Sequence, residues 1–261
     1  MKRALIAVTA LAALGALAVA GTFAGSGGGG GASPDTAAAA EVIPLKEAKL
    51  NIEHNATDED TGFQGFIDSE GWQRLTVRGP GGEILNLEAR GELRDLGMTE
   101  LFFETVEPAN EDVPLEEILE TLPEGQYTFS GPAIEDGVLV GRTTGTALLT
   151  HDIPAGPELL TPAEGAAVAL KHTVMSWGAV DETIDGEPVT IIAYQLIIEK
   201  VGDPTPHMIG KFGLSMYLPP SVTSMEVPEG FLEPGTEYAW EVLAIEASGN
   251  QTLSSGTFHT E

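Results

Sequence analysis

The chain of 261 residues is long enough for one or two domains, and its 42% hydrophobic content is ordinary for a sequence that folds a core. Its 12 basic and 40 acidic side chains give a formal net charge of −28 at pH 7. This charge excludes nucleic acid and anionic membrane surfaces as expected partners, since both attract positively charged proteins. The expected partner is an unidentified protein or glycan, or a metal ion.

The N-terminal segment has the pattern of an export signal. Lys2 and Arg3 precede an apolar run over 4–19, and the small residues Ala18 and Ala20 follow where a signal peptidase cuts. We therefore predict a signal peptide over 1–20 and a secreted or periplasmic protein, with an uncleaved membrane anchor as the alternative. The Gly/Ala/Ser-rich stretch over 21–41 is expected to be a flexible leader.

The segment 42–156 is predicted to be a first β domain. "WQRLTVRGPGGEILNLEAR" predicts a hairpin that turns between Gly79 and Gly82, and "TELFFETVE" and "GVLVGRTTGTALLTHD" predict further strands. One short helix is expected in "VPLEEILETL", where apolar residues recur at helical spacing.

A polar cluster, "EHNATDEDTG" from Glu53 to Gly62, is the one stretch with metal-like composition. Asp58 and Asp60 are candidate Ca²⁺ ligands there, because carboxylate oxygens are the ligands that hard cations prefer. The spacing does not match an EF-hand, and a solvated turn between two strands is the alternative. No other cofactor is predicted. Five isolated histidines and the lack of a serine elbow give no indication of an enzyme.

The segment 157–261 is predicted to be a β-sandwich, because period-two segments alternate there with turn residues. The expected strands are Val168–Trp177, Thr190–Lys200, Thr223–Val227, Thr236–Ile245 and Ser255–Thr260. In Thr190–Lys200, one face is expected to carry Ile192, Tyr194, Leu196 and Ile198.

The stretch "FLEPGTEYAWEVLAIEASGN" closely resembles a fibronectin type III domain, in which a Pro-Gly-Thr turn precedes a tyrosine-led strand. The matching residues are Leu232, Pro234, Gly235, Thr236, Tyr238, Val242 and Ala244. The resemblance implies a tyrosine corner, a scaffold or recognition role and no catalysis. The expected core aromatic residues are Trp177, Tyr194, Tyr238 and Trp240.

A similar turn at Pro123–Tyr127 suggests that the first domain is also immunoglobulin-like. The expected fold is all-β: two tandem immunoglobulin-like or fibronectin type III-like β-sandwiches, with one short helix in the first. The Pro-rich linker "DIPAGPE" is expected to hold them semi-rigidly.

Three aliphatic residues of the second domain, Ile197, Leu243 and Ile245, are expected on the outer face of their sheet, because alternate strand residues lie on opposite faces. Exposed aliphatic residues on neighbouring strands indicate either an interface with the first domain or a surface that binds a partner. The expected function is exported, non-catalytic binding or structural presentation at the cell envelope. The alternative is a calcium-dependent or carbohydrate-binding accessory module, the latter with Trp72 as an exposed stacking platform instead of a core residue.

The export signal gives the first testable prediction. Mature protein purified from the producing cell should begin near Gly21, because signal peptidase cuts after small residues. Intact-mass spectrometry checks this. A mature chain that retains residues 1–20 would show that the segment is kept as an anchor.

Overall fold

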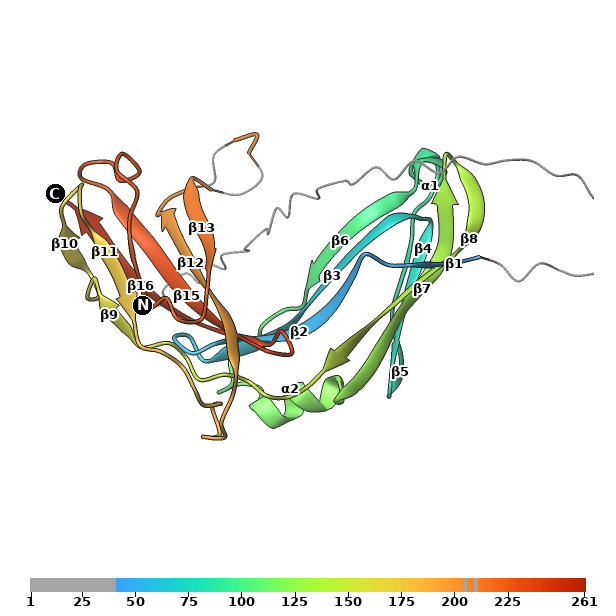
Figure 1. Cartoon of the computed structure of the whole chain (residues 1–261), viewed down its shortest axis with the longest axis horizontal. Helices are drawn as coiled ribbons and strands as arrows, with labels where there is room; N and C mark the ends of the chain where they lie inside the picture. Colours follow the sequence, from blue (N-terminus) through green and yellow to red (C-terminus); the bar gives the residue numbers. More distant parts are fainter. Residues whose placement is uncertain (1–40, 204–205, 209–210) are drawn as a thin grey trace, which may run out of the picture.

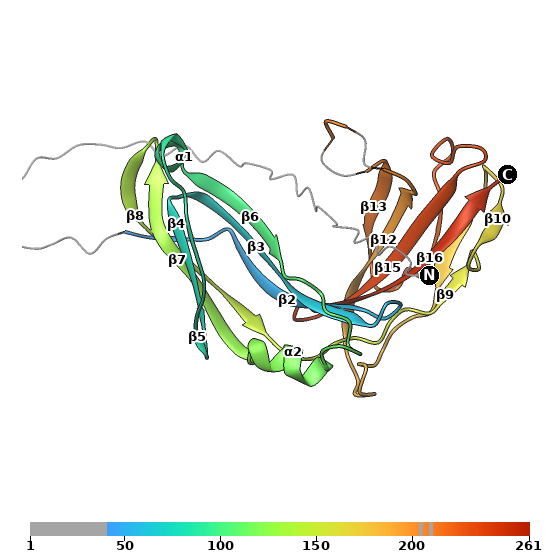
Figure 2. The ribbon, with the colours of Figure 1, turned by 180° about the vertical axis from the view of Figure 1, so that it is seen from behind.

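The computed structural model describes residues 41–203, 206–208 and 211–261, so that the predicted signal peptide and the leader up to residue 40 lie outside it. The described chain is mostly β-structure and forms two lobes arranged as the arms of a V (Figure 1; Figure 2 shows the reverse side). No helix in these ranges is long and apolar enough to cross a membrane.

The N-terminal lobe is one strongly curled sheet with two short helices, of which α2 packs against the core. Its layers are β2, β3 and β6 on one side, and β5, β4, β7, β8 and β1 on the other. The layers meet at a corner where Trp72 pairs with Ala133. The elements are β1 (Val42–Pro44), β2 (Glu47–Asn55), β3 (Asp60–Trp72), β4 (Arg74–Gly79), β5 (Gly82–Glu88), α1 (Glu92–Leu96), β6 (Met98–Glu104), α2 (Leu115–Thr121), β7 (Gly125–Glu135) and β8 (Val138–Leu149).

The core of this lobe lies between the two layers. Ile52 and Phe63 come from one layer, Val77 and Phe129 come from the other, and Ile118 of α2 packs against them. The predicted hairpin is formed by β4 and β5, and the predicted helix is α2. The one-turn helix α1 was not predicted from the sequence. It lies between Gly91 and Gly97, which both have positive φ and bound it on either side.

The C-terminal lobe is a sandwich of two antiparallel layers. Strands β9, β11 and β14 form one layer, while β13, β12, β15 and β16 form the other, with β10 added in parallel to β16. Three strands against four is the arrangement of a fibronectin type III-like sandwich. The elements are β9 (Leu159–Thr161), β10 (Ala166–Val168), β11 (Val174–Trp177), β12 (Ile191–Lys200), β13 (Gly213–Leu218), β14 (Ser224–Glu226), β15 (Glu237–Glu246) and β16 (Gln251–Thr260).

Two details of the strand prediction in this lobe were wrong. The stretch Val168–Trp177 is not one strand, because β10 and β11 belong to opposite layers and the chain crosses between them. Ile192 does not share the core face of β12 and is 50% exposed. A β-bulge between Ile191 and Ala193 shifts the register there, and Ile191 packs against the core instead.

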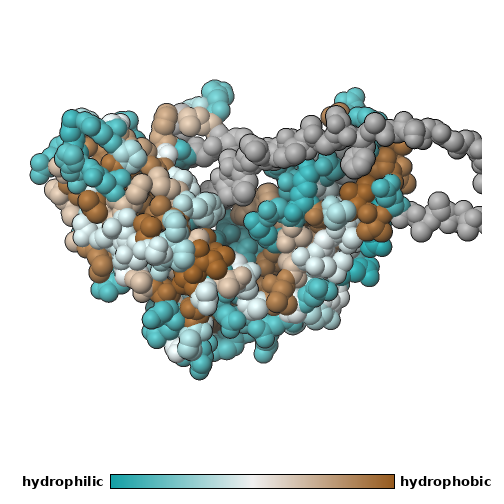
Figure 3. Space-filling view, in the orientation of Figure 1, coloured by the Kyte–Doolittle hydropathy of each residue, from teal (hydrophilic) through white to brown (hydrophobic). Residues whose placement is uncertain are grey.

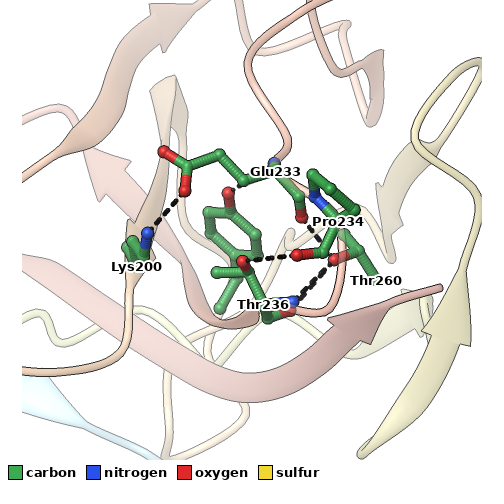
Figure 4. Close-up of polar contacts among 6 residues, drawn as sticks. Lys200, Glu233, Pro234, Thr236 and Thr260 are labelled. Atoms are coloured by element: carbon green, nitrogen blue, oxygen red, sulfur yellow. Dashed lines mark hydrogen bonds and ion pairs between the residues drawn. The ribbon is translucent and has the colours of Figure 1, made fainter.

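Both lobes contain a tyrosine corner. In the C-terminal lobe, the Glu233 amide donates to the Tyr238 hydroxyl at 2.9 Å, and the Thr236 amide donates to Thr260 Oγ1 at 2.9 Å (Figure 4). In the N-terminal lobe, the Tyr127 hydroxyl donates to the Pro123 carbonyl at 2.8 Å. Each tyrosine is buried at the start of a long strand, so the hydroxyl fixes the turn that leads into it.

The two corners should contribute measurably to stability. Tyr238→Phe leaves a backbone amide without its acceptor, and Tyr127→Phe leaves a carbonyl without its donor. Each is expected to lower the free energy of unfolding by about 1–2 kcal/mol. Urea unfolding measures the loss, and Tyr217→Phe is the control because that ring is 54% exposed. Equal effects of Tyr238→Phe and the control would contradict a role for the corner.

Candidate functional site

The two lobes are joined through their main chains. Strand β16 of the C-terminal lobe pairs in parallel with β2 of the N-terminal lobe, with Gln251–Leu253 opposite Glu53–Asn55. Beyond the ladder, the Ala56 amide donates to the Leu253 carbonyl at 2.9 Å, and the Ser255 amide donates to Thr57 Oγ1 at 2.8 Å. One sheet therefore runs from one lobe into the other.

The side chain of Asn250 reinforces this junction and is 1% exposed. Its Oδ1 accepts from the Ile52 amide of β2 at 2.9 Å. Its Nδ2 donates to the carbonyls of Thr150 and Asp152 in the linker, at 3.0 and 3.1 Å. Asn250 thus bonds to the N-terminal lobe and the linker with both ends of its amide, a pattern that neither Asp nor Leu can reproduce.

The joined sheet carries acidic residues on the face turned away from the N-terminal core. Ile245, Gln251, Glu53 and Gly62 lie opposite one another on four successive strands, which places them on one face. Figure 3 shows that the surface is hollowed between the lobes and that hydrophilic residues lie in the hollow. We call this surface the acidic face and define it by Glu53, Asp60, Gln64, Glu104, Glu107 and Glu241.

Three carboxylates of the acidic face converge. Each of Glu53, Glu104 and Glu107 has an oxygen within 4.8 Å of the others. Two glutamines hold the first two in place: Gln251 Nε2 donates to Glu53, and Gln64 Nε2 donates to Glu104 at 2.9 Å. The glutamines are themselves linked, with Gln251 Nε2 donating to Gln64 Oε1 at 3.1 Å. The carboxylates are therefore oriented by amide groups and not by basic side chains.

The pKa values of the acidic face reflect its burial. Burial raises the pKa of Glu53 to about 7, and the hydrogen bond from Gln251 partly offsets this. Burial, followed by the charges of Glu53 and Glu104, raises the pKa of Glu107 to about 8. Burial and then the charge of Glu53 raise the pKa of Glu241 to about 8. Like charges held close together in low dielectric need a proton or a cation to neutralise them.

The two predicted metal ligands lie in different environments. Asp58 lies exposed in the β2–β3 turn, where its Oδ2 accepts from Asn55 Nδ2 at 3.2 Å. Asp60 begins β3, is 3% exposed, and has an Oδ1 without a hydrogen-bond partner. Burial and the charge of Asp58 raise the pKa of Asp60 to about 6. Asp58 is therefore exposed and hydrogen-bonded within the turn, whereas Asp60 is buried at the start of β3.

The three predicted surface aliphatics point away from the sandwich core but are not exposed. Ile197 is 4% and Leu243 is 2% exposed, and they form a small buried cluster with Leu253. Leu253 belongs to the part of β16 that pairs with β2, so the cluster lies beside the junction. Ile245 is half-buried. Ile197 and Leu243 therefore lie on the outer face of their sheet, where they are buried beside the junction and do not form an open surface.

The aromatic residues that were predicted for the core lie in it. Trp177 and Tyr194 meet edge to face at 5.7 Å between ring centroids, and Tyr238 stacks on Phe258 at 5.4 Å. Trp240 is 1% exposed. Trp72 is 2% exposed at the corner of the N-terminal lobe, so it is a core residue and not a stacking platform for sugars.

Sequence reasoning missed most of this site. Glu53 and Asp60 stood in the acidic stretch that was noticed, whereas Glu104 ends a strand about 50 residues later and Glu107 follows that strand. Their only signal was the spacing of two acids at the end of "TELFFETVE". Asn250 gave no signal beyond turn composition, because its partners are 98 to 198 positions away.

Comparisons with known proteins give a limited result. No protein-family model matches the chain, and no curated protein matches it. Among solved structures, the chain is similar to the FN1-FN3 domains of chicken CNTN1, with a TM-score of 0.31, 13% identity and coverage of 85% of this chain and 69% of that one. It is also similar to a two-domain fibronectin type III segment of chicken tenascin, with a TM-score of 0.28, 14% identity and coverage of 82% and 97%. The fibronectin type III-like description of the C-terminal lobe rests on its own strand order and tyrosine corner.

The raised pKa of Glu241 predicts a pH-dependent stability. The folded protein keeps the Glu241 proton up to a pKa of about 8, whereas the unfolded chain releases it near 4.5. Between these two pKa values the folded state binds more protons than the unfolded chain. The stability that protonated Glu241 contributes is therefore lost as the pH rises from about 4.5 to about 8. The charges around Glu241 are those of Glu53, Glu199, Lys211 and Asp58.

Glu241→Gln should remove this dependence, since glutamine stays neutral in both states. Between about pH 5 and pH 9 in EDTA, the wild type is expected to lose roughly 2–4 kcal/mol more than the variant, at about 1.4 kcal/mol per pKa unit. Thermal unfolding across pH measures this. Glu135→Gln, at an exposed position of β7, is the control. Parallel curves for wild type and Glu241→Gln would refute the assignment.

Proposed function

We propose that this protein is an exported, non-catalytic binding or structural presentation module of the cell envelope, which holds two β lobes at a fixed angle. The observation that carries the proposal is the junction, where β2–β16 pairing and the buried Asn250 amide connect the lobes. A short linker alone leaves tandem domains free to move, whereas a shared sheet does not. A fibronectin type III-like sandwich suits a binding or structural role.

The charge of the chain and the predicted export signal support the choice of partner and location. A net charge of −28 favours neutral or cationic partners and a well-solvated environment outside the cell. The partner class that fits is a protein or glycan of the envelope. The predicted leader over 21–41 would then act as a flexible spacer between the two-lobed part of the protein and the membrane across which it is exported.

The fixed angle can be measured, because the chain contains no cysteine that would compete for labels. Thr99→Cys on β6 and Ser221→Cys before β14 are exposed and lie in different lobes. Pulsed electron paramagnetic resonance on the spin-labelled pair should give one narrow distance distribution. Asn250→Ala should broaden it and cost about 2–4 kcal/mol of stability, because it leaves buried backbone groups unpaired.

Asn86→Ala is the matched control, since Asn86 is exposed and its amide donates only to Glu83. It should leave both the distribution and the stability unchanged. A broad distribution in the wild type would overturn the fixed-angle proposal. Envelope proteins captured by wild type and Asn86→Ala, but not by Asn250→Ala, would support presentation by both lobes. Capture that is equal for all three would show that the angle is not needed.

A further inference from the structure

The convergence of Glu53, Glu104 and Glu107 includes no basic side chain of the described residues. Within the described ranges, none of these three side chains, nor that of Asp60, forms an ion pair with a basic residue. Glu53 is 7% and Asp60 3% exposed. Buried carboxylates without an oppositely charged partner are costly, so a group that compensates their charge is expected here.

A second observation points to a ligand at this place. Asp60 Oδ1 is buried and has no hydrogen-bond partner in the described structure. Asp60 lies two residues before Gly62 on the same face of β3, and Glu107 lies over Gly62, where an added Cβ would come within 2.7 Å of Glu107 Cγ. The Asp60 charge acts on both Glu53 and Glu107. The unpartnered Asp60 oxygen therefore lies on the same face of the sheet as the three glutamates, next to their cluster but not within it.

The donor set and its size select the kind of cation. All the donors are carboxylates, which favours a hard cation over zinc or copper. Two oxygens on one Ca²⁺ lie at most about 5 Å apart, whereas on Mg²⁺ the limit is about 4.2 Å. The glutamate oxygens lie within 4.8 Å of one another, which is a span that one Ca²⁺ can bridge. Gln64 and Gln251 hold Glu104 and Glu53 as outer partners of the ligands.

We propose that Glu53, Glu104 and Glu107 form a Ca²⁺ site on the acidic face beside the junction of the two lobes, with the unpartnered Asp60 carboxylate next to it. Glu53 lies on β2 opposite Gln251 of β16, so an ion bound there braces the strand that joins the lobes. Glu104 ends β6, and Glu107 lies in the segment after it, so the same ion ties that segment to β2. This site is independent of the proposed presentation function, which stands or falls on the junction itself.

Calorimetry with Ca²⁺ tests the site on the whole mature chain after treatment with EDTA. The wild type should bind one Ca²⁺ with a Kd of roughly 10⁻⁵ to 10⁻³ M, and Mg²⁺ should bind about tenfold more weakly or less. Glu104→Gln combined with Glu107→Gln should weaken Ca²⁺ binding about tenfold or more, because it removes two ligands. Glu135→Gln with Asp136→Asn removes the same charge from the exposed β7–β8 turn and should bind like the wild type.

Melting in EDTA and in Ca²⁺ gives the second readout. Ca²⁺ should raise the melting temperature of the wild type and of the control variant. The Glu104 and Glu107 double variant should melt at or above the wild type in EDTA, because it relieves like-charge repulsion, and should not respond to Ca²⁺. If the double variant does not fold, Glu107→Gln alone replaces it. No binding by the wild type up to about 10 mM Ca²⁺, or undiminished binding by the variant, overturns the proposal.

Discussion

The pairing of β16 with β2 is the constraint on which the rest of the structure depends. A sandwich lobe normally ends in an edge strand whose amides and carbonyls face water, and such an edge invites association. Here the edge at Gln251–Leu253 is covered by the other lobe. Because backbone bonds fix register as well as distance, this contact sets the angle of the V and aligns side chains from five strands on one face.

Asn250 explains how a junction built from three paired residues can hold. The oxygen of its side-chain amide accepts from the Ile52 amide of the N-terminal lobe, and the nitrogen donates to the carbonyls of Thr150 and Asp152. These distances lie between 2.9 and 3.1 Å. Glu246 supports it from the preceding strand, because its side-chain carboxylate accepts from the backbone amide of Asn250 at 3.0 Å. A buried polar network that is fully satisfied specifies one arrangement, whereas apolar packing alone tolerates several. The small cluster of Ile197, Leu243 and Leu253 then adds apolar burial beside it.

The acidic face is a consequence of the same geometry. Gln251 reaches Glu53 and Gln64 because β16 lies beside β2, and Gln64 reaches Glu104 because β6 pairs with β3. Each carboxylate is thereby held against its like-charged neighbours at some cost in stability. The general acidity of the chain adds to that cost. Strain of this kind is common where a protein binds an ion or a partner.

The sequence alone determined the fold class, the hairpin of β4 and β5, the helix α2 and the positions of most strands in the C-terminal lobe. These features follow from local rules: a period of two, a period of 3.6, and Pro/Gly turns, which act over a few residues. The tyrosine corner at Tyr238 belongs with them, since Tyr238 and Glu233 are five residues apart.

Only the tertiary structure decided the bulge that exposes Ile192, the crossing between β10 and β11, and the burial of Leu243. It also decided which of 40 acidic residues meet. Glu53 and Glu107 are brought together by strand pairing between segments that have no shared pattern, and Asn250 by contacts with residues up to 198 positions away. Side-chain spacing along a chain carries no information on such pairs, because register between distant strands is set by the packing of the whole sheet.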